Sequence, residues 1–113
     1  MTRSAAELRG RRAEQIAALL LVLKGWRILA RRRQLPMIEV DIVARRGGVV
    51  AVVEVKQRPT LEAALAAVTP AAAARLRAAA RQIAAEQGAT VVGRVDVIAL
   101  APGRWPRHIA GVE

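Results

Sequence analysis

The sequence predicts an α/β protein with a small mixed β-sheet flanked by helices, and three observations predict it. Two runs rich in β-branched residues, 37–44 and 49–56, are separated by a short segment ending in Gly47-Gly48, as in a β-hairpin. A long alanine-rich helix is expected over 70–87, and a third β-rich run covers 91–100. Because a helix separates the last two runs, their strands can lie parallel in one sheet.

The first third of the chain has weaker signals. Residues 1–12 are polar and basic and are expected to form an N-terminal arm. Apolar residues at helical spacing predict a helix over 13–23, which Gly25 is well placed to end. A short strand is expected over 26–30, followed by an arginine triple and a break at Pro36.

The second half has clearer signals. Thr69 is a good N-cap, Pro70 suits the first helical position, and Gly88 is the expected stop. The other expected boundaries are a helical turn over 61–68, a strand over 91–100 broken or bulged at Gly93, and a tail over 101–113. With 113 residues, the chain is expected to form one domain, 1–113.

Composition narrows the possible chemistry. The absence of cysteine excludes disulfides, thiol nucleophiles and thiolate zinc sites, and the one histidine, His108, is expected to be a solvated tail residue. Any bound metal would need oxygen ligands, which favours Mg²⁺ or Mn²⁺. The apolar run 16–23 is too short to cross a bilayer and no cleavage site follows it, so a cytoplasmic protein without membrane contact is expected.

Positive charge is concentrated at the N-terminal end. The formal net charge is +10, and residues 1–33 hold nine Arg or Lys against Glu7 and Glu14, which gives +7. A polyanionic partner would account for this charge, because each neutralised phosphate releases a counterion. The alternative is that the arginine-rich, alanine-rich composition reflects a GC-rich genome.

Four charged residues are expected on one face of the hairpin. A turn at its two glycines places Asp41 opposite Glu54 and Glu39 opposite Lys56, and the alternation of side chains puts all four on the same face. The other face, expected to be core, carries Ile38, Val40, Ile42, Ala51, Val53 and Val55. Facing carboxylates repel unless a cation lies between them, so a Mg²⁺ or Mn²⁺ site is one interpretation. An exposed sheet face with ordinary salt bridges is the other.

The motif Asp41 followed by Glu54-Val55-Lys56 resembles the D…ExK signature of the PD-(D/E)XK nuclease superfamily. A wider set of blocks resembles the YraN-like family of small bacterial proteins, which are related to Holliday-junction resolvases. The blocks are Arg12-Ala13-Glu14-xx-Ala17, Gly25-Trp26-Arg27-Ile28-Leu29, Glu39-Val40-Asp41-Ile42-Val43, Val53-Glu54-Val55-Lys56-Gln57-Arg58, Ala67-Val68-Thr69-Pro70 and Arg94-Val95-Asp96-Val97. The chain departs from the family's pattern at Met37-Ile38, where two glycines are usual, and at 71–74, where basic residues are usual.

The resemblance implies a restriction-endonuclease-like core with Asp41 and Glu54 as metal ligands and Lys56 as the catalytic lysine. Mg²⁺ or Mn²⁺ would bind weakly, and more readily with substrate present. Glu14 would be an outer member of the acidic cluster, or else a solvated glutamate near a helix start, and Glu39 is a second outer candidate. For Arg94 and Asp96, a structural salt bridge is at least as good an interpretation as catalysis.

Three function classes remain open. The first is a metal-dependent endonuclease acting on structured nucleic acid, DNA before RNA. The others are a non-catalytic nucleic-acid-binding module and a structural protein whose basic arm contacts an acidic partner. In the first two, a phosphate-binding rim is expected from Arg9, Arg11, Arg12, Arg31, Arg32 and Arg33. A homodimer is a further expectation, since the alanine-rich helix could pack against its mate.

Overall fold

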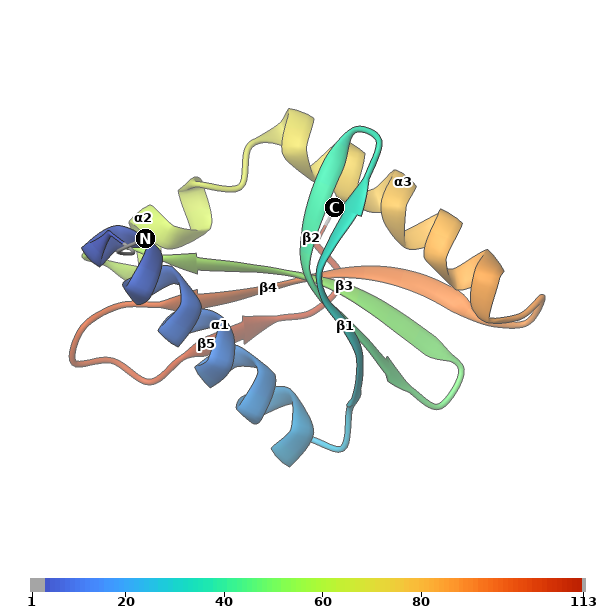
Figure 1. Cartoon of the computed structure of the whole chain (residues 1–113), viewed down its shortest axis with the longest axis horizontal. Coiled ribbons are helices and arrows are strands. Elements are labelled where there is room, and N and C mark those ends of the chain that lie inside the picture. Colours follow the sequence, from blue (N-terminus) through green and yellow to red (C-terminus); the bar gives the residue numbers. More distant parts are fainter. Residues whose placement is uncertain (1–3, 113) are drawn as a thin grey trace.

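The computed structural model describes residues 4–112 and has three helices and a five-stranded mixed sheet of order β1-β2-β3-β4-β5 (Figure 1). The elements are α1 (Ala5–Leu23), β1 (Arg27–Leu35), β2 (Ile38–Arg46), β3 (Val49–Gln57), α2 (Leu61–Ala66), α3 (Pro70–Gln87), β4 (Val92–Leu100) and β5 (Arg107–Ile109). The expected mixed sheet flanked by helices is therefore confirmed.

Helix α1 begins eight residues earlier than expected. Ser4 is its N-cap and accepts a hydrogen bond from the Glu7 N–H at 3.1 Å. The expectation of an extended arm is wrong for residues 5–12, which form the first turns of α1; residues 1–3 of that arm lie outside the described residues. The overlooked signal is Ser4-x-x-Glu7, the sequence pattern of a capping box.

Strand β1 is longer than expected, because it continues to Leu35 and turns into β2 at Pro36-Met37. The arginine triple 31–33 therefore lies within the strand and not after it. Arg32 has a φ of 51°, the one positive value among the described residues other than glycine. A left-handed residue breaks the alternation of side chains, so the middle of β1 is not a regular strand.

The β2–β3 hairpin turns at its glycines as expected, and residues 42–46 pair with 53–49 in the expected register. Strands β3 and β4 are parallel and are joined through α2 and α3. Thr69 caps α3 by accepting from the Ala72 N–H at 3.1 Å, and Pro70 is its first residue. The helix ends at Gln87, with Gly88 as the C-cap, as predicted.

Two expectations about the C-terminal part are wrong. Strand β4 is not bulged at Gly93, since its register with β3 is continuous; a Cβ at this position would lie 2.4 Å from the Ala80 oxygen, so Gly93 allows α3 to approach the strand closely. Residues 101–113 are not simply a tail, because β5 pairs antiparallel with β4 through Val97, Ile98 and Ala99.

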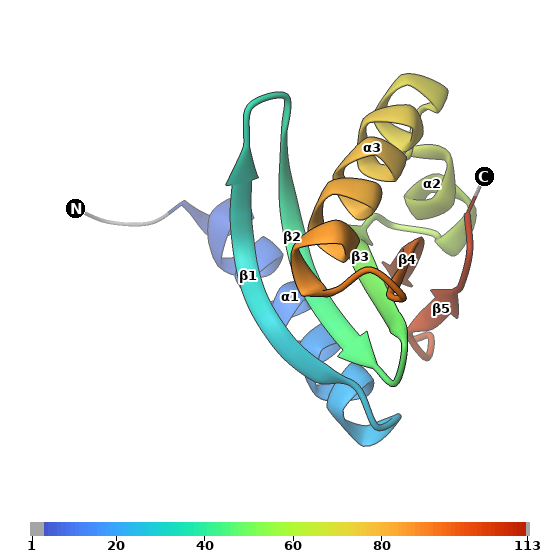
Figure 2. The same ribbon diagram turned by 90° about the vertical axis from the view of Figure 1, so that its right-hand side faces the viewer.

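The sheet lies between α1 and α3 (Figure 2), and each face has its own apolar core. The α1 face includes Ala17, Leu21 and Ile42, whereas the α3 face includes Leu76 and Ile83. None of the helices within residues 4–112 is long and apolar enough to cross a membrane.

Candidate active site

The candidate site lies where β2 and β3 separate. The paired register of the two strands stops at Ile42 and Val53. Beyond this point β2 follows β1, while β3 continues beside β4 toward α2, so that the two strands diverge (Figure 1). Asp41 and Glu54 are the first residues past the last pair. The expected direct pairing of Asp41 with Glu54 is therefore not formed, but both residues lie where the two strands begin to diverge.

Asp41 departs from the regular pleat of β2. Val40 packs in the core on the α3 face and Ile42 in the core on the α1 face, although alternation would put them on the same face. The expectation that Ile38, Val40 and Ile42 share a face is therefore wrong. The irregularity lies opposite the left-handed Arg32 of β1, and it turns Asp41 toward β3, where its Oδ2 accepts from the Val55 N–H at 2.7 Å.

The Glu54 carboxyl lies against that of Asp41. Burial, a hydrogen bond with Asp41 and the repulsion of its charge raise the pKa of Glu54 to about 8, although Lys56 and the Val55 N–H act in the opposite direction. Glu54 is only 9% exposed. At neutral pH without a cation, Glu54 is therefore protonated and hydrogen-bonded to Asp41.

Asp41 lines a hollow between α1 and the sheet, which we call the acidic hollow. Its lining residues are Glu7, Gly10, Arg11, Glu14, Arg32, Asp41 and Val55. Glu54 does not line this hollow and is the more buried of the two acids. A cation or phosphate entering from solvent would therefore meet Asp41 first.

Glu14 lies at the acidic hollow, but arginines occupy its carboxylate. Arg31 Nε donates to Glu14 Oε1 at 2.8 Å, and Arg32 Nη1 donates to the same oxygen at 3.2 Å. Two consecutive strand residues normally point to opposite faces, and the left-handed backbone of Arg32 lets both reach Glu14. Glu14 is therefore buried beside the acidic hollow with its charge already balanced, so it is not the solvated glutamate of the alternative interpretation.

Glu39 does not join this cluster. It is exposed and lies opposite Gln34 of β1, on the part of β2 that has already left β3. The predicted pairing of Glu39 with Lys56 is not formed, because the β2–β3 register ends before either residue. Its expected place beside the other acids is therefore wrong.

The arginines of the expected rim divide into three groups. Arg31 and Arg32 bind Glu14, and Arg33 Nη2 donates to Glu86 of α3 at 2.8 Å, on the other side of the sheet. Arg11 lines the acidic hollow and Arg9 lines the neighbouring cavity. Arg12 is exposed on α1 and lines neither.

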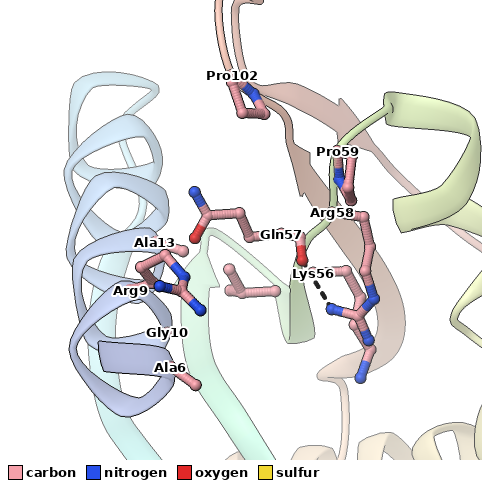
Figure 3. A pocket seen from close by; sticks show the side chains of 10 residues that line it. Ala6, Arg9, Gly10, Ala13, Lys56, Gln57, Arg58, Pro59 and Pro102 are labelled. Atoms are coloured by element: carbon pink, nitrogen blue, oxygen red, sulfur yellow. Dashed lines mark hydrogen bonds between the residues drawn. The ribbon is translucent and has the colours of Figure 1, made fainter. Parts of the chain in front are cut away.

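The neighbouring cavity, which we call the basic cleft, has a volume of about 560 Å³. It is lined by Ala6, Arg9, Gly10, Ala13, Val55, Lys56, Gln57, Arg58, Pro59 and Pro102. Arg9 extends from α1 toward Gln57, whereas Lys56 and Arg58 extend from the end of β3 (Figure 3). The candidate catalytic lysine therefore belongs to the basic cleft, next to the acidic hollow.

The donor set suits a weakly held hard cation. Within residues 4–112, no three side chains of histidine, cysteine, aspartate or glutamate are grouped so that they could hold a metal ion. Asp41 and Glu54 together offer two carboxylates, and Mg²⁺ is commonly bound by one or two carboxylates with water and substrate phosphates completing its shell. The residues present therefore fit such an ion, provided that water and substrate supply the remaining oxygens.

A second buried carboxylate, Asp96 of β4, is fully partnered. Arg94 donates to both of its oxygens at 2.8 and 2.9 Å, His108 Nε2 lies 2.8 Å from Oδ2, and the Gly111 N–H donates at 3.1 Å. Of the two interpretations left open for Arg94 and Asp96, the salt bridge is the one that the structure contains. The expectation for His108 is wrong: its side chain is 7% exposed, because β5 brings it against Asp96.

Two residues of the site were not singled out from the sequence. Arg58, directly after β3, and Gly10, inside α1, both line the basic cleft. Arg58 had a signal, since it follows Lys56 by two residues and therefore falls on the same side of an extended chain. The signal at Gly10 was weaker, because a glycine is not unusual in a segment that was expected to be an extended arm.

The comparison with known proteins gives a family. The model of "Uncharacterised protein family UPF0102" matches residues 13–100. A UPF0102 protein of Caulobacter sp. (strain K31) is 56% identical over 108 residues, which cover 94% of this chain and 78% of the relative. UPF0102 proteins of Caulobacter vibrioides (strain NA1000 / CB15N) and Chelativorans sp. (strain BNC1) are 54% and 45% identical, covering 94% and 99% of this chain and 86% and 92% of theirs.

Proposed function

Since the chain belongs to the uncharacterised UPF0102 family, we propose from the geometry of the site that the protein is a metal-dependent endonuclease of the PD-(D/E)XK type. Its substrate is structured nucleic acid, and DNA is favoured over RNA. One observation carries the proposal: the carboxyl groups of Asp41 and Glu54 meet where β2 leaves β3, with Lys56 two residues further along the same strand.

The cost of this arrangement supports a functional interpretation. Burial and the neighbouring carboxyl group raise the pKa of Glu54 to about 8, which means that the fold destabilises the ionised form of this side chain. Within the described residues, neither Asp41 nor Glu54 forms an ion pair. An acid with a perturbed pKa beside a hollow is typical of a functional site, and a divalent cation would offset the repulsion between the two carboxylates.

Each residue then has a chemical role. Asp41 and Glu54 would hold Mg²⁺ or Mn²⁺, which when bound would supply Lewis acidity and lower the pKa of water. The Val55 N–H fixes the Asp41 carboxylate, and burial together with Asp41 keeps the proton on Glu54 in the metal-free protein. Lys56 stabilises negative charge that develops on the phosphate. The restriction-endonuclease-like core is part of the same proposal, supported by the position of this motif on a central hairpin of a mixed sheet.

The test is a cleavage assay with branched, flapped, single-stranded and duplex DNA, and with RNA, in Mg²⁺ and in Mn²⁺. We expect cleavage of at least one structured DNA, reduced on the order of 100-fold or more in Glu54→Gln. Glu39→Gln is the matched control, because this exposed glutamate on β2 lies away from the site and its loss should leave the rate unchanged. Cleavage that survives Glu54→Gln would contradict the proposal.

Metal binding is tested separately by calorimetry with manganese. We expect weak binding that is lost in the Asp41→Asn, Glu54→Gln double variant. Equal binding by the wild type and the double variant would exclude these two residues as ligands. Binding of nucleic acid without cleavage of any substrate in either metal would instead favour the non-catalytic binding module.

A further inference from the structure

The acidic hollow and the basic cleft adjoin. Gly10 of α1 and Val55 of β3 line both. On one side of this junction lie Asp41 and Glu14, and on the other lie Arg9, Lys56 and Arg58. A chain-like anion that reaches Asp41 could therefore continue past Gly10 into the cleft without leaving the protein surface.

The cations of the basic cleft are free for a ligand, unlike the arginines of β1. Within residues 4–112, Arg9, Lys56 and Arg58 form no ion pair with a carboxylate; Arg58 only donates to the Gln57 carbonyl at 2.7 Å. The triple 31–33 is bound to Glu14 and Glu86. Unpaired positive charge therefore lines the cleft as well as the acidic hollow, where Arg11 also forms no ion pair within the described residues. Figure 3 shows Arg9 on the α1 side of the cleft and Lys56 and Arg58 at the end of β3.

Gly10 is the second observation that points to a ligand. A glycine inside a helix destabilises it relative to alanine, and α1 continues for five residues before Gly10 and thirteen after it. No packing contact requires the glycine, because a Cβ at this position would meet nothing within 4 Å. Because Gly10 has no side chain, the junction between the acidic hollow and the basic cleft stays open.

We propose that a single strand of DNA lies in the basic cleft, its phosphates held by Arg9 and Arg58, and crosses α1 at Gly10 to enter the acidic hollow. This inference rests on the proposed function, since it names the part of the substrate that leads to the cut phosphodiester. Arginine suits the task because its planar fork grips phosphate in two places.

The dimensions and lining of the cleft favour one strand over a duplex. Its volume of about 560 Å³ falls in the range of small-ligand sites, and α1 and Pro102 wall it on two sides. A duplex is instead held over a broad exposed surface. No aromatic side chain lines the cleft, so bases cannot stack there, and binding should depend on phosphates with little preference for sequence.

The test is equilibrium binding of a labelled single-stranded DNA and of its blunt duplex, by fluorescence anisotropy with EDTA present. We expect the wild type to prefer the single strand. The Arg9→Ala, Arg58→Ala double variant should bind it on the order of 10- to 100-fold less tightly, with a salt slope shallower by about 0.7 for each phosphate that is no longer neutralised. Arg75→Ala, Arg81→Ala is the matched control, because it removes equal charge from exposed positions on α3, across the sheet.

A second variant separates binding from folding. Gly10→Leu should leave the melting temperature equal or higher, since leucine favours helix, yet weaken single-strand binding by filling the junction. Equal losses in the cleft variant and the α3 control, or binding unaffected by Gly10→Leu, would overturn the inference. Cleft-dependent binding without cleavage would leave this inference standing and remove the proposed function; cleavage unaffected by either cleft variant would do the reverse.

Discussion

Asp96 of β4 and Glu54 of β3 are buried carboxyl groups on neighbouring strands, and the fold favours opposite charge states for the two. At Asp96 of β4, burial alone would raise the pKa, but hydrogen bonds from His108, Arg94 and the Gly111 N–H outweigh it and lower the pKa to about 2. At Glu54 of β3, burial and the facing Asp41 carboxyl group raise the pKa to about 8. The fold therefore stabilises Asp96 in its ionised form and Glu54 in its protonated form.

The difference separates a structural carboxylate from a candidate functional one. The partners of Asp96 join β4 to β5 and to the end of α1, since Lys24 Nζ lies 2.9 Å from His108 Nδ1. An ammonium group can only donate, so Nδ1 accepts and Nε2 carries the proton donated to Asp96. Every member of this network has a partner within the chain, whereas neither Asp41 nor Glu54 forms an ion pair within residues 4–112.

The largest expected effect is at Asp96. Asp96→Ala should lower the free energy of unfolding by about 3 kcal/mol, because it leaves Arg94 and His108 without their shared anion. Asp41→Asn in metal-free buffer should leave stability unchanged or raise it, because it removes the Asp41 charge that opposes ionisation of Glu54, while an amide oxygen can still accept from the Val55 N–H. Urea denaturation of both variants at pH 7 measures the contrast. Equal losses would erase the distinction between the two places.

A smaller loss is expected at His108. His108→Ala should cost about 1.5 kcal/mol, the contribution of one hydrogen bond to a charged group. Lys24→Met is the matched control, since it removes only the exposed contact with Nδ1 and should cost less than about 0.5 kcal/mol. If the two variants lose the same stability in urea denaturation, the buried bond to Asp96 is not what holds β5 in place.

The local features of the sequence were enough for the hairpin and for α3. Two glycines set the register of β2 with β3, and Thr69 and Pro70 start α3 where the structure has it. The same register brought Asp41 and Glu54 to the same point along the hairpin. Elements set by short-range turn and cap chemistry were predictable, because each signal acts within a few residues.

The features that were missed depend on distant partners. The arginine triple 31–33 looks like a loop in sequence, yet it forms a strand because β2 pairs beside it and Glu14 and Glu86 bind its side chains. His108 looks like a tail residue until β5 pairs with β4. The turn of Asp41 out of the pleat accompanies the left-handed Arg32 on the neighbouring strand, and nothing in the hairpin's own sequence indicated it.

The pH dependence of stability offers a further test of the raised pKa of Glu54. The folded protein keeps the Glu54 proton up to about pH 8, whereas the unfolded chain loses it near pH 4.5. The contribution of Glu54 to the free energy of unfolding is therefore most favourable below pH 4.5, and it falls as the pH rises toward 8. Between pH 6 and 7, wild-type stability relative to Glu54→Gln should fall by about 1 kcal/mol. Parallel stability profiles for the two proteins, from urea denaturation in metal-free buffer, would show that Glu54 titrates normally.

The smallest expected effect concerns Glu14, which combines features of Asp96 and Glu54. It lies at the acidic hollow near Asp41, but two arginines neutralise its charge, as Arg94 does for Asp96. Arg31→Ala should cost only about 0.5 kcal/mol of stability, because a third of this arginine side chain is exposed. It should also strengthen manganese binding a few-fold, because it removes one positive charge beside the hollow and leaves Glu14 with Arg32. Arg33→Ala removes the same charge from a pair with Glu86 across the sheet, where screening should make its effect on the metal negligible. Equal manganese affinities for these two variants, measured by calorimetry, would remove Glu14 from the acidic cluster and leave Asp41 and Glu54 as its only members.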